Sequence, residues 1–425
     1  MTQAASHKPI TEFKPHRVSA FSGKLGFARR MVLKRLAQIS RGCLRVHESG
    51  NVHTFGEEDG QTDLVADIYV QDMRVYTDVM FSGSIGSAEA YMSDYWSTPC
   101  LRSVIQIFVR NIDALDAMDT SQSLVSRIML GLYSRFSRNT HTGAKRNISA
   151  HYDLGNDFFS LFLDKSMMYS SAIYPHPEAS LEEAATYKLQ VICERLCLND
   201  TDHLLEIGTG WGGLALYAAS HYGCRVTTTT ISEEQYKHAQ QIVKDAGLEH
   251  LITVKCNDYR ELEGSYSKLV SVEMIEAVGH EYYAEYFKVC SRLLTTDGLM
   301  LLQAITIVDQ RYDMARKQTD FIQRYIFPGG GLPSATHILQ LLTRHTQLNL
   351  VHFQEIGQDY ARTLNAWRKR FMAELGAVRE QGFDDRFIRM WEFYLCYCEG
   401  GFRERSIGTG QFLLAGPDYR PSTQV

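Results

Sequence analysis

The chain has 425 residues, of which 44% are apolar and 22% charged, a balance typical of folded domains rather than of disordered chains. A chain of this length exceeds the size at which single hydrophobic cores stop growing, so we expect two domains. The formal net charge of −5 argues against a general nucleic-acid-binding protein. The nine cysteines include no C-x-x-C pair, which argues against a full disulfide framework and a zinc site and favours a reducing, cytoplasmic compartment.

The first predicted element is a basic helix. No Asp or Glu occurs from Phe13 to His47. Within this stretch apolar and basic side chains alternate, namely Phe27, Met31, Leu33 and Leu36 with Arg29, Arg30, Lys34 and Arg35. The pattern is typical of an amphipathic helix on an anionic membrane surface. A helix that packs on its own domain with a solvated basic face fits equally well.

The elements that follow indicate a small α+β domain over residues 1–117, which we assign to lipid or membrane association. We predict strands at Cys43–His47, Leu64–Val70 and Arg74–Val79, a turn at Gly83–Gly86 and a helix over Ser103–Leu115. The Ser/Thr/Arg-rich stretch that follows predicts a linker over residues 118–148.

Residues 149–425 alternate between strand and helix patterns, which predicts a parallel sheet covered on both faces. We therefore expect an α/β, Rossmann-like domain with helical additions. The predicted strands are Leu204–Ile207, Cys224–Ile231, Leu251–Cys256, Leu269–Glu273, Leu299–Ile307 and Gly410–Ala415, and the predicted helices are Gly213–Tyr222, Glu233–Ala246, Tyr282–Leu294, Tyr360–Glu380 and Asp385–Glu399.

A glycine-rich turn joins the first of these strands to its helix. It reads L-L-E-I-G-T-G-W-G-G, and Gly208, Gly210 and Gly212 would let a ligand approach the backbone closely. Glu206, two residues before the first glycine, can hold the positively charged amino end of S-adenosylmethionine. The spacing departs from that of a dinucleotide site, and a tight turn that merely needs small residues remains an alternative.

Ordered sequence blocks then identify a family. They include H-Y-D-L-G-N-D-F-F from His151, M-Y-S-S-A from Met168, T-I-S-E-E-Q from Thr230, S-V-E-M-I-E-A-V-G from Ser271, Y-I-F-P-G-G-G-L-P-S from Tyr325, D-Y-A-R-T-L from Asp359 and C-E-G-G-F-R-E-R from Cys398. With these blocks the chain resembles the cyclopropane fatty acid and mycolic acid cyclopropane synthases. The N-terminal block G-S-I-G-S-A-E-A-Y-M from Gly83 is similar to the phospholipid-acting bacterial members.

The resemblance implies an S-adenosylmethionine site. By it, Tyr169 and Ser170 contact the methionine end of the cofactor, and Glu206, Gly208 and Gly210 line its carboxylate and amine. Thr230 and Gln235 would then contact the ribose, and Tyr259 and Arg260 the adenine.

The resemblance also implies a bicarbonate ion beside the reacting carbons, held by Glu276, Tyr360 and the backbone of Ile305. Two positions depart from the family. Ser171 stands where many members have Cys, and Gln303 where they have His. Gln303 can donate a hydrogen bond but cannot carry a positive charge, so we expect weaker anion binding and an uncertain base.

Cys398 falls inside a family block and is expected in the active site. No histidine partner is recognisable beside it, so we interpret it as a pocket-lining thiol rather than as a nucleophile. Aromatic side chains in the blocks could stabilise a carbocation by about 0.5–2 kcal/mol each, although core packing explains most aromatics equally well. The candidates are Tyr325, Phe327, Tyr360, Tyr394 and Phe402.

The implied activity is the transfer of a methylene group from S-adenosylmethionine to the double bond of an unsaturated acyl chain of a phospholipid, which forms a cyclopropane ring. One alternative is a C-methyltransferase that does not close the ring, and another is an inactive lipid-binding module. The expected partners are a bilayer surface and unsaturated acyl chains, with no nucleic acid and no metal, and a homodimer is a further expectation. We expect cytoplasmic protein bound peripherally at the inner face of the membrane.

Overall fold

The computed structural model describes residues 23–57, 64–116 and 154–421. The predicted linker at residues 118–148 lies outside the described residues. The domain boundaries therefore stay predictions.

The described N-terminal residues form a four-stranded sheet with helices, hereafter the N-terminal unit (residues 23–116). The strands have the order β2-β1-β3-β4, in which β1 and β3 are parallel. The elements are α1 Gly23–Leu36, β1 Cys43–Glu48, β2 Asn51–Phe55, β3 Val65–Val70, α2 Arg74–Met92, β4 Trp96–Ser97, α3 Leu101–Arg110 and α4 Ile112–Asp116.

Two predictions in this unit were wrong. The predicted strand Arg74–Val79 is the first part of α2, and the predicted turn Gly83–Gly86 lies within the same helix. The helix is kinked where Gly83 adopts φ 55°, ψ −129°. The β-branched residues favoured a strand, but the buried side chains of Val75 and Tyr76 pack into the core of the unit as part of a helix.

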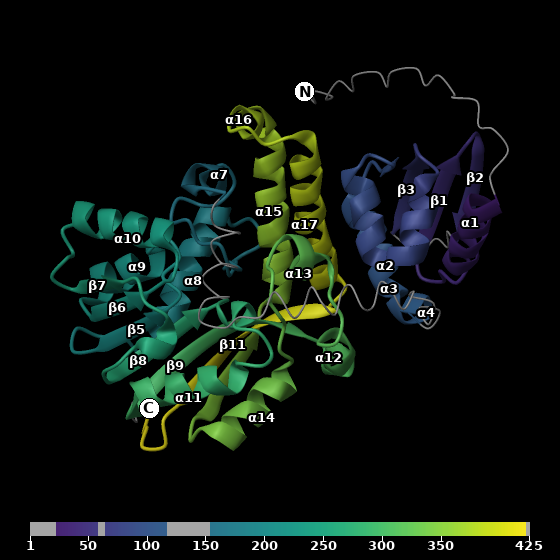
Figure 1. Ribbon diagram of the computed structural model, residues 1–425. Helices are drawn as coiled ribbons and strands as arrows, with labels where there is room; N and C mark the ends of the chain where they lie inside the picture. The colour runs from purple at the N-terminus through teal and green to yellow at the C-terminus, as the bar shows by residue number, and fades with distance from the viewer. Residues whose placement is uncertain (1–22, 58–63, 117–153, 422–425) are drawn as a thin grey trace.

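The second part of the chain is a seven-stranded, mostly parallel sheet with helices on both sides, which confirms the predicted Rossmann-like α/β class (Figure 1). The strand order is β10-β11-β9-β8-β5-β6-β7, and β11 is antiparallel to both of its neighbours. The strands are β5 His203–Ile207, β6 Arg225–Thr229, β7 Ile252–Lys255, β8 Tyr266–Val272, β9 Leu294–Ile307, β10 Asn349–Glu355 and β11 Ile407–Ala415.

The helices of this part include several that the sequence patterns did not predict, among them α12, α13 and α14. The α-helices are α7 Asn156–Ser160, α8 Leu181–Arg195, α9 Gly213–Tyr222, α10 Glu233–Asp245, α11 Tyr283–Leu293, α12 Asp309–Ala315, α13 Phe321–Tyr325, α14 Ala335–His345, α15 Gly357–Ala373, α16 Leu375–Glu380 and α17 Asp385–Arg403. Two short 3₁₀ helices, η2 Tyr259–Glu261 and η3 Ile275–Ala277, follow β7 and β8.

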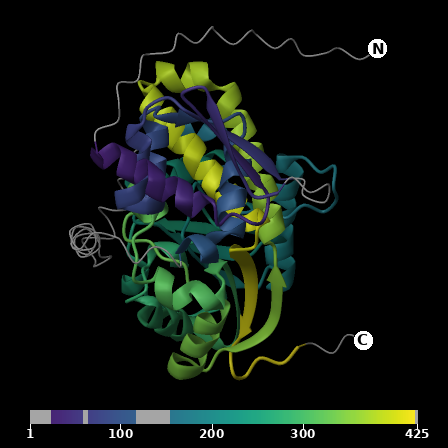
Figure 2. The same ribbon diagram turned by 90° about the vertical axis from the view of Figure 1, so that its right-hand side faces the viewer.

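Helices α15 and α17 stand between the sheet and the N-terminal unit (Figures 1 and 2). One hydrophobic cluster continues from the N-terminal unit through α17 into an aromatic group around α7 and α15. In that group Phe158 lies 4.9 Å from Trp391 between ring centroids. The two parts of the chain therefore share a core.

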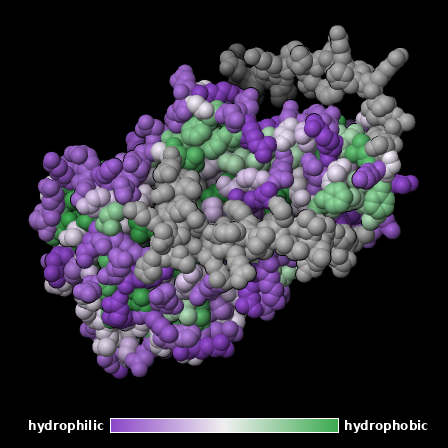
Figure 3. Space-filling model, viewed as in Figure 1, coloured by the Kyte–Doolittle hydropathy of each residue, from purple (hydrophilic) through white to green (hydrophobic). Residues whose placement is uncertain are grey.

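No helix in the described ranges is both long and apolar enough to cross a bilayer. On the face shown in Figure 3, hydrophobic side chains are interspersed among hydrophilic ones. The exposed large apolar residues of the N-terminal unit include Phe27, Met31 and Phe81.

Candidate active site

A cavity of ≈ 2250 Å³ lies at the carboxyl ends of the parallel strands and extends to the N-terminal unit. Parallel α/β sheets bind ligands at this edge because the loops there leave a crevice between the helices. The volume exceeds the roughly 300–1,000 Å³ of ordinary small-molecule sites. It therefore offers room for a second, larger ligand beside a nucleoside.

The glycine turn after β5 forms one wall of the cavity. Gly208 and Gly210 line it with φ values of 101° and 52°, a backbone region that glycine enters without steric cost. A Cβ atom on Gly210 would meet nothing within 4 Å, so a ligand can reach the backbone there.

Gly212 does not have the predicted ligand-facing position. It is not among the lining residues, and a Cβ there would lie 3.2 Å from that of Ala239, so this glycine allows α9 to pack against α10.

Glu206 is the penultimate residue of the buried strand β5 and lines the same cavity. Thr228 Oγ1 donates a 2.6 Å hydrogen bond to its carboxylate. Burial raises the pKa of Glu206 to about 8, which the Thr228 bond partly offsets. A buried carboxylate without a cationic partner in the described chain is suited to a positively charged ligand. The residues of this wall therefore fit S-adenosylmethionine.

The other predicted cofactor residues surround the turn. Tyr169, Ser170, Thr230, Gln235, Tyr259 and Arg260 all line the cavity. Thr230 Oγ1 donates a 2.9 Å hydrogen bond to Gln235 Oε1. The guanidinium group of Arg260 forms an ion pair with the Asp258 carboxylate at 2.6 Å. The hydroxyl of Tyr259 is buried and has no hydrogen-bond partner among the described residues, so it can still bind a ligand atom.

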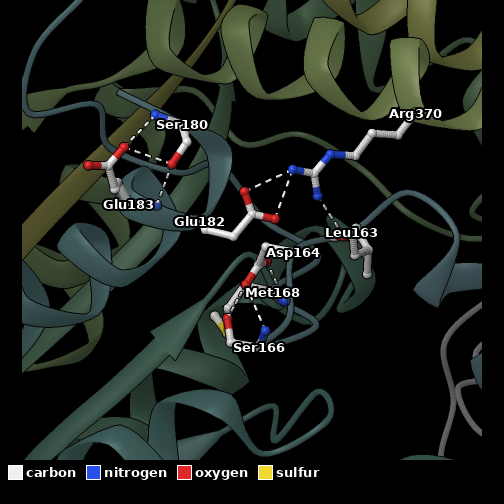
Figure 4. A network of polar contacts seen from close by, with 8 residues as sticks. All are labelled: Leu163, Asp164, Ser166, Met168, Ser180, Glu182, Glu183 and Arg370. Atoms are coloured by element: carbon white, nitrogen blue, oxygen red, sulfur yellow. Dashed lines mark hydrogen bonds and ion pairs between the residues drawn. The ribbon is translucent and has the colours of Figure 1, made fainter. Parts of the chain in front are cut away.

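The segment that leads into Tyr169 and Ser170 is held by polar contacts (Figure 4). The Asp164 carboxylate accepts bonds from the backbone N–H groups of Ser166 and Met168 at 2.8 and 3.1 Å. On α15, Arg370 donates to Glu182 on α8 and to the carbonyl of Leu163. These contacts hold the segment against α15.

The predicted anion site has an unexpected occupant, the carboxylate of Glu273. Its Oε1 accepts hydrogen bonds from the Ser171 N–H at 2.9 Å and from Gln303 Nε2 at 2.8 Å, and its Oε2 accepts one from the Tyr360 hydroxyl at 2.8 Å. Three of the groups expected to hold bicarbonate therefore already bind a carboxylate of the chain. The residues present do not fit a separate bicarbonate ion at this position.

Glu276 lies beside this group and also lines the cavity. One of its oxygens accepts a hydrogen bond from the backbone N–H of Ile305, whereas the other is buried without a partner among the described residues. Burial, with a further contribution from Glu273, raises the pKa of Glu276 to about 8. Burial also raises the pKa of Glu273, against its three hydrogen bonds.

Gln303 makes hydrogen bonds with both ends of its side-chain amide. Its amide nitrogen donates to Glu273, and its amide oxygen accepts from Gln411 Nε2 at 2.8 Å. Ser171 and Gln303 are fully buried and are not among the lining residues of the cavity. Both act toward Glu273 rather than toward the open space.

Cys398 lines the cavity, and burial raises the pKa of its thiol well above the usual range. A thiol is a poor nucleophile until it ionises, which agrees with a pocket-lining role. The five candidate aromatic residues Tyr325, Phe327, Tyr360, Tyr394 and Phe402 line the cavity as well.

Sequence reasoning missed Glu273 and Lys188. Glu273 stands in the S-V-E-M-I-E-A-V-G block, three residues before the predicted site residue Glu276, and the block alone does not distinguish the roles of the two glutamates. Lys188 is fully buried on α8, donates to Ser170 Oγ at 2.7 Å and has its pKa lowered to about 8 by burial. A single lysine in a helical pattern does not indicate that its side chain is buried beside the active site.

Comparisons with known proteins show which proteins this chain resembles. A family model described as mycolic acid cyclopropane synthetase matches residues 139–412. The chain is 38% identical over 339 residues to tuberculostearic acid methyltransferase UfaA1 of Mycobacterium tuberculosis, covering 78% of this chain and 79% of the relative. It is 36% identical over 354 residues to cyclopropane-fatty-acyl-phospholipid synthase of Escherichia coli K12, covering 82% and 88%.

Among solved structures, mycolic acid cyclopropane synthase CmaA1 complexed with SAH and CTAB is similar with a TM-score of 0.60 and 30% identity. The match covers 64% of this chain and 98% of that structure.

Proposed function

Because the chain belongs to the mycolic acid cyclopropane synthetase family and is an S-adenosylmethionine-dependent methyltransferase, we propose that it acts on an unsaturated acyl chain of a membrane phospholipid and closes a cyclopropane ring on the double bond. The observation that carries the proposal is the cavity, which joins the glycine turn to the N-terminal unit. A methyl donor and an acyl chain can thus meet in one cavity.

The wall that the N-terminal unit contributes is suited to an acyl chain. Each methylene that leaves lipid without an apolar replacement would cost about 0.8 kcal/mol, so a lipid substrate needs such a wall. The apolar lining residues from this unit include Val79, Phe81, Ile85, Phe108, Val109 and Ile112. This lining supports an acyl chain as the second ligand.

The reacting end of the cavity supplies the groups that the chemistry needs. Bound S-adenosylmethionine supplies an electrophilic methyl group and leaves as S-adenosylhomocysteine with the electron pair of the broken S–C bond. The hydroxyl groups of Tyr169 and Tyr394 form a 2.8 Å hydrogen bond. The rings of Tyr360 and Phe402 are stacked, with 4.5 Å between their centroids. These aromatic faces can stabilise a carbocation on the acyl chain and keep water away from it.

The test is to incubate the protein with S-adenosylmethionine and vesicles whose phospholipids carry a cis-monounsaturated chain. We expect each modified chain to gain one CH₂ and lose its olefinic protons, and NMR to show cyclopropane protons. Gly210→Asn is the control, since asparagine tolerates the left-handed backbone while its side chain enters the cavity. Absence of any lipid product from the folded wild-type protein would contradict the proposal.

A second candidate is methyl addition without ring closure. It is favoured by the 38% identity to a tuberculostearic acid methyltransferase and by the departures at Ser171 and Gln303. The same product measurement separates the two candidates. A gain of one CH₂ with the double bond retained would indicate the methyltransferase.

We further propose that α1 docks on an anionic bilayer. Its outer stripe exposes Lys24, Phe27, Arg30, Met31 and Lys34, which recur at helical spacing. Its residues Val32 and Leu36 line the cavity instead. The helix that faces outward with basic and apolar side chains therefore also borders the space proposed for the acyl chain.

A further inference from the structure

We infer that Glu273 is the active-site base and that its carboxylate replaces the separate bicarbonate ion expected of the family. The inference rests on the proposed function, because it concerns the proton that leaves after methyl transfer. Its starting point is the convergence of Ser171 N–H, Gln303 Nε2 and the Tyr360 hydroxyl on one carboxylate, each within 2.9 Å. A site built to bind an anion has thus been filled from within the chain.

The backbone at Glu273 is held in an unusual conformation to achieve this. Glu273 directly follows β8, its φ is 50°, and its N–H donates to the Gln303 carbonyl at 2.8 Å. Positive φ is unfavourable for a glutamate and is retained mainly where a function requires it. Here it aims the carboxylate at the three donors and into the cavity.

The surroundings favour one negative charge at this position. Three donors stabilise the Glu273 carboxylate, whereas Glu276 accepts from backbone N–H groups alone and leaves one oxygen without a partner among the described residues. Of two adjacent buried carboxyl groups, the better solvated one ionises first. The buried ammonium group of Lys188, which donates to Ser170 Oγ, further favours the negative charge on Glu273. Glu273 is therefore the ionised member of the pair, and Glu276 holds the proton.

The proton balance of the step is simple. The π electrons of the double bond form the new bond to the methyl carbon, which leaves a cation on the acyl chain. An oxygen of Glu273 then takes one proton from the transferred methyl group. The electron pair of that C–H bond closes the third side of the ring onto the cationic carbon. Glu273 returns the proton to solvent before the next turnover, and no bicarbonate is consumed or required.

Two variants at this position distinguish a base from a structural residue. Glu273→Gln keeps the shape but removes the charge, and we expect it to bind S-adenosylmethionine and lose turnover by about a hundredfold or more. Glu273→Gly removes the side chain and suits the positive φ. Because it leaves the donors of Ser171, Gln303 and Tyr360 open, we expect its turnover to be low in buffer purged of CO₂ and to rise saturably with added bicarbonate or formate. The glutamine variant should not respond.

Binding provides a readout that does not depend on turnover. ¹³C-bicarbonate observed by NMR should bind to Glu273→Gly and not to the wild-type protein. Stimulation of the wild type by bicarbonate, full activity of Glu273→Gln, or failure of the folded glycine variant to bind bicarbonate or formate would each overturn the inference. A wild-type protein that makes no lipid product would contradict the proposed function instead, and the NMR comparison would still report on the anion site.

Discussion

Glu206 shows how one buried side chain can link cofactor binding to pH. Its carboxyl group is enclosed at the end of β5, and burial raises its pKa to about 8. Below that pH the group is protonated in the free protein. A cation placed beside it favours the ionised form, so binding of S-adenosylmethionine should expel the proton.

We therefore predict that binding of S-adenosylmethionine releases close to one proton between about pH 6 and 7, where the ammonium group of the ligand itself stays charged. The affinity should rise with pH across this interval because the ionised form binds the cation. Calorimetry in two buffers of different ionisation enthalpy measures the release. Glu206→Gln should bind more weakly and release no proton. Equal heats in both buffers for the wild type would contradict the assignment.

At single positions the sequence predicted some features and not others, for physical reasons. The strand, turn and helix around Gly208 and Gly210 are local, so their pattern could be predicted, and their positive φ values agree with it. The direction of Glu273 depends on a single φ of 50° and on donors about 30 to more than 100 residues away. No periodicity indicates such a contact.

At the scale of elements, α1 corrects the simple picture of a uniformly basic helix. Arg29 is turned inward and forms an ion pair with the buried carboxylate of Glu48, which also accepts from Tyr76. Arg35 lines the cavity. Only part of the predicted basic set therefore belongs to the outer stripe of Lys24, Arg30 and Lys34.

We predict that reversing the three exposed charges, in Lys24→Glu, Arg30→Glu and Lys34→Glu together, weakens binding to anionic vesicles. Each basic residue near such a surface contributes about 1 kcal/mol, and the effect should shrink as salt rises because screening shortens to about 8 Å at physiological ionic strength. Vesicle co-sedimentation measures the change.

The matched control reverses three lysines on α10 and α11, with Lys237→Glu, Lys244→Glu and Lys288→Glu, all exposed in the folded chain. The control has the same net charge as the α1 variant and should bind vesicles more tightly than it does. Equal binding by the two variants would mean that the outer stripe of α1 is simply a solvated face.

The helix α2 shows where local propensity fails. Its first residues R-V-Y-T-D-V are rich in β-branched side chains, which favours a strand. The structure starts a helix there instead, where the Asp72 carboxylate accepts from the Arg74 N–H at 2.9 Å and the Tyr76 hydroxyl reaches Glu48. A local contact at the start of the helix and a contact with a residue distant in sequence together outweighed the strand preference.

At the scale of the whole molecule, the last family block serves to join the two parts of the chain. Glu399 is fully buried on α17 and forms ion pairs with Arg102 of α3, with Arg368 and with Arg403. Tyr91 of α2 donates to Glu392 at 2.8 Å, and Arg389 donates to the Trp96 carbonyl at 2.9 Å. The C-E-G-G-F-R-E-R block could be recognised from the sequence, but its docking role requires knowledge of what lies opposite.

Gly400 provides the test of this interface, because a Cβ there would lie 2.6 Å from Ile105 Cγ2 on α3. Overpacking of this kind costs about 1–3 kcal/mol, so Gly400→Ala should lower the midpoint of thermal unfolding and reduce lipid turnover, since α3 carries part of the cavity wall. Gly376→Ala on α16 is the control, because a Cβ there meets nothing within 4 Å. Combining Gly400→Ala with Ile105→Ala should recover part of the loss, since the second change removes the clashing methyl group. If Gly400→Ala were as stable as the control, α3 and α17 would not be held together at this contact.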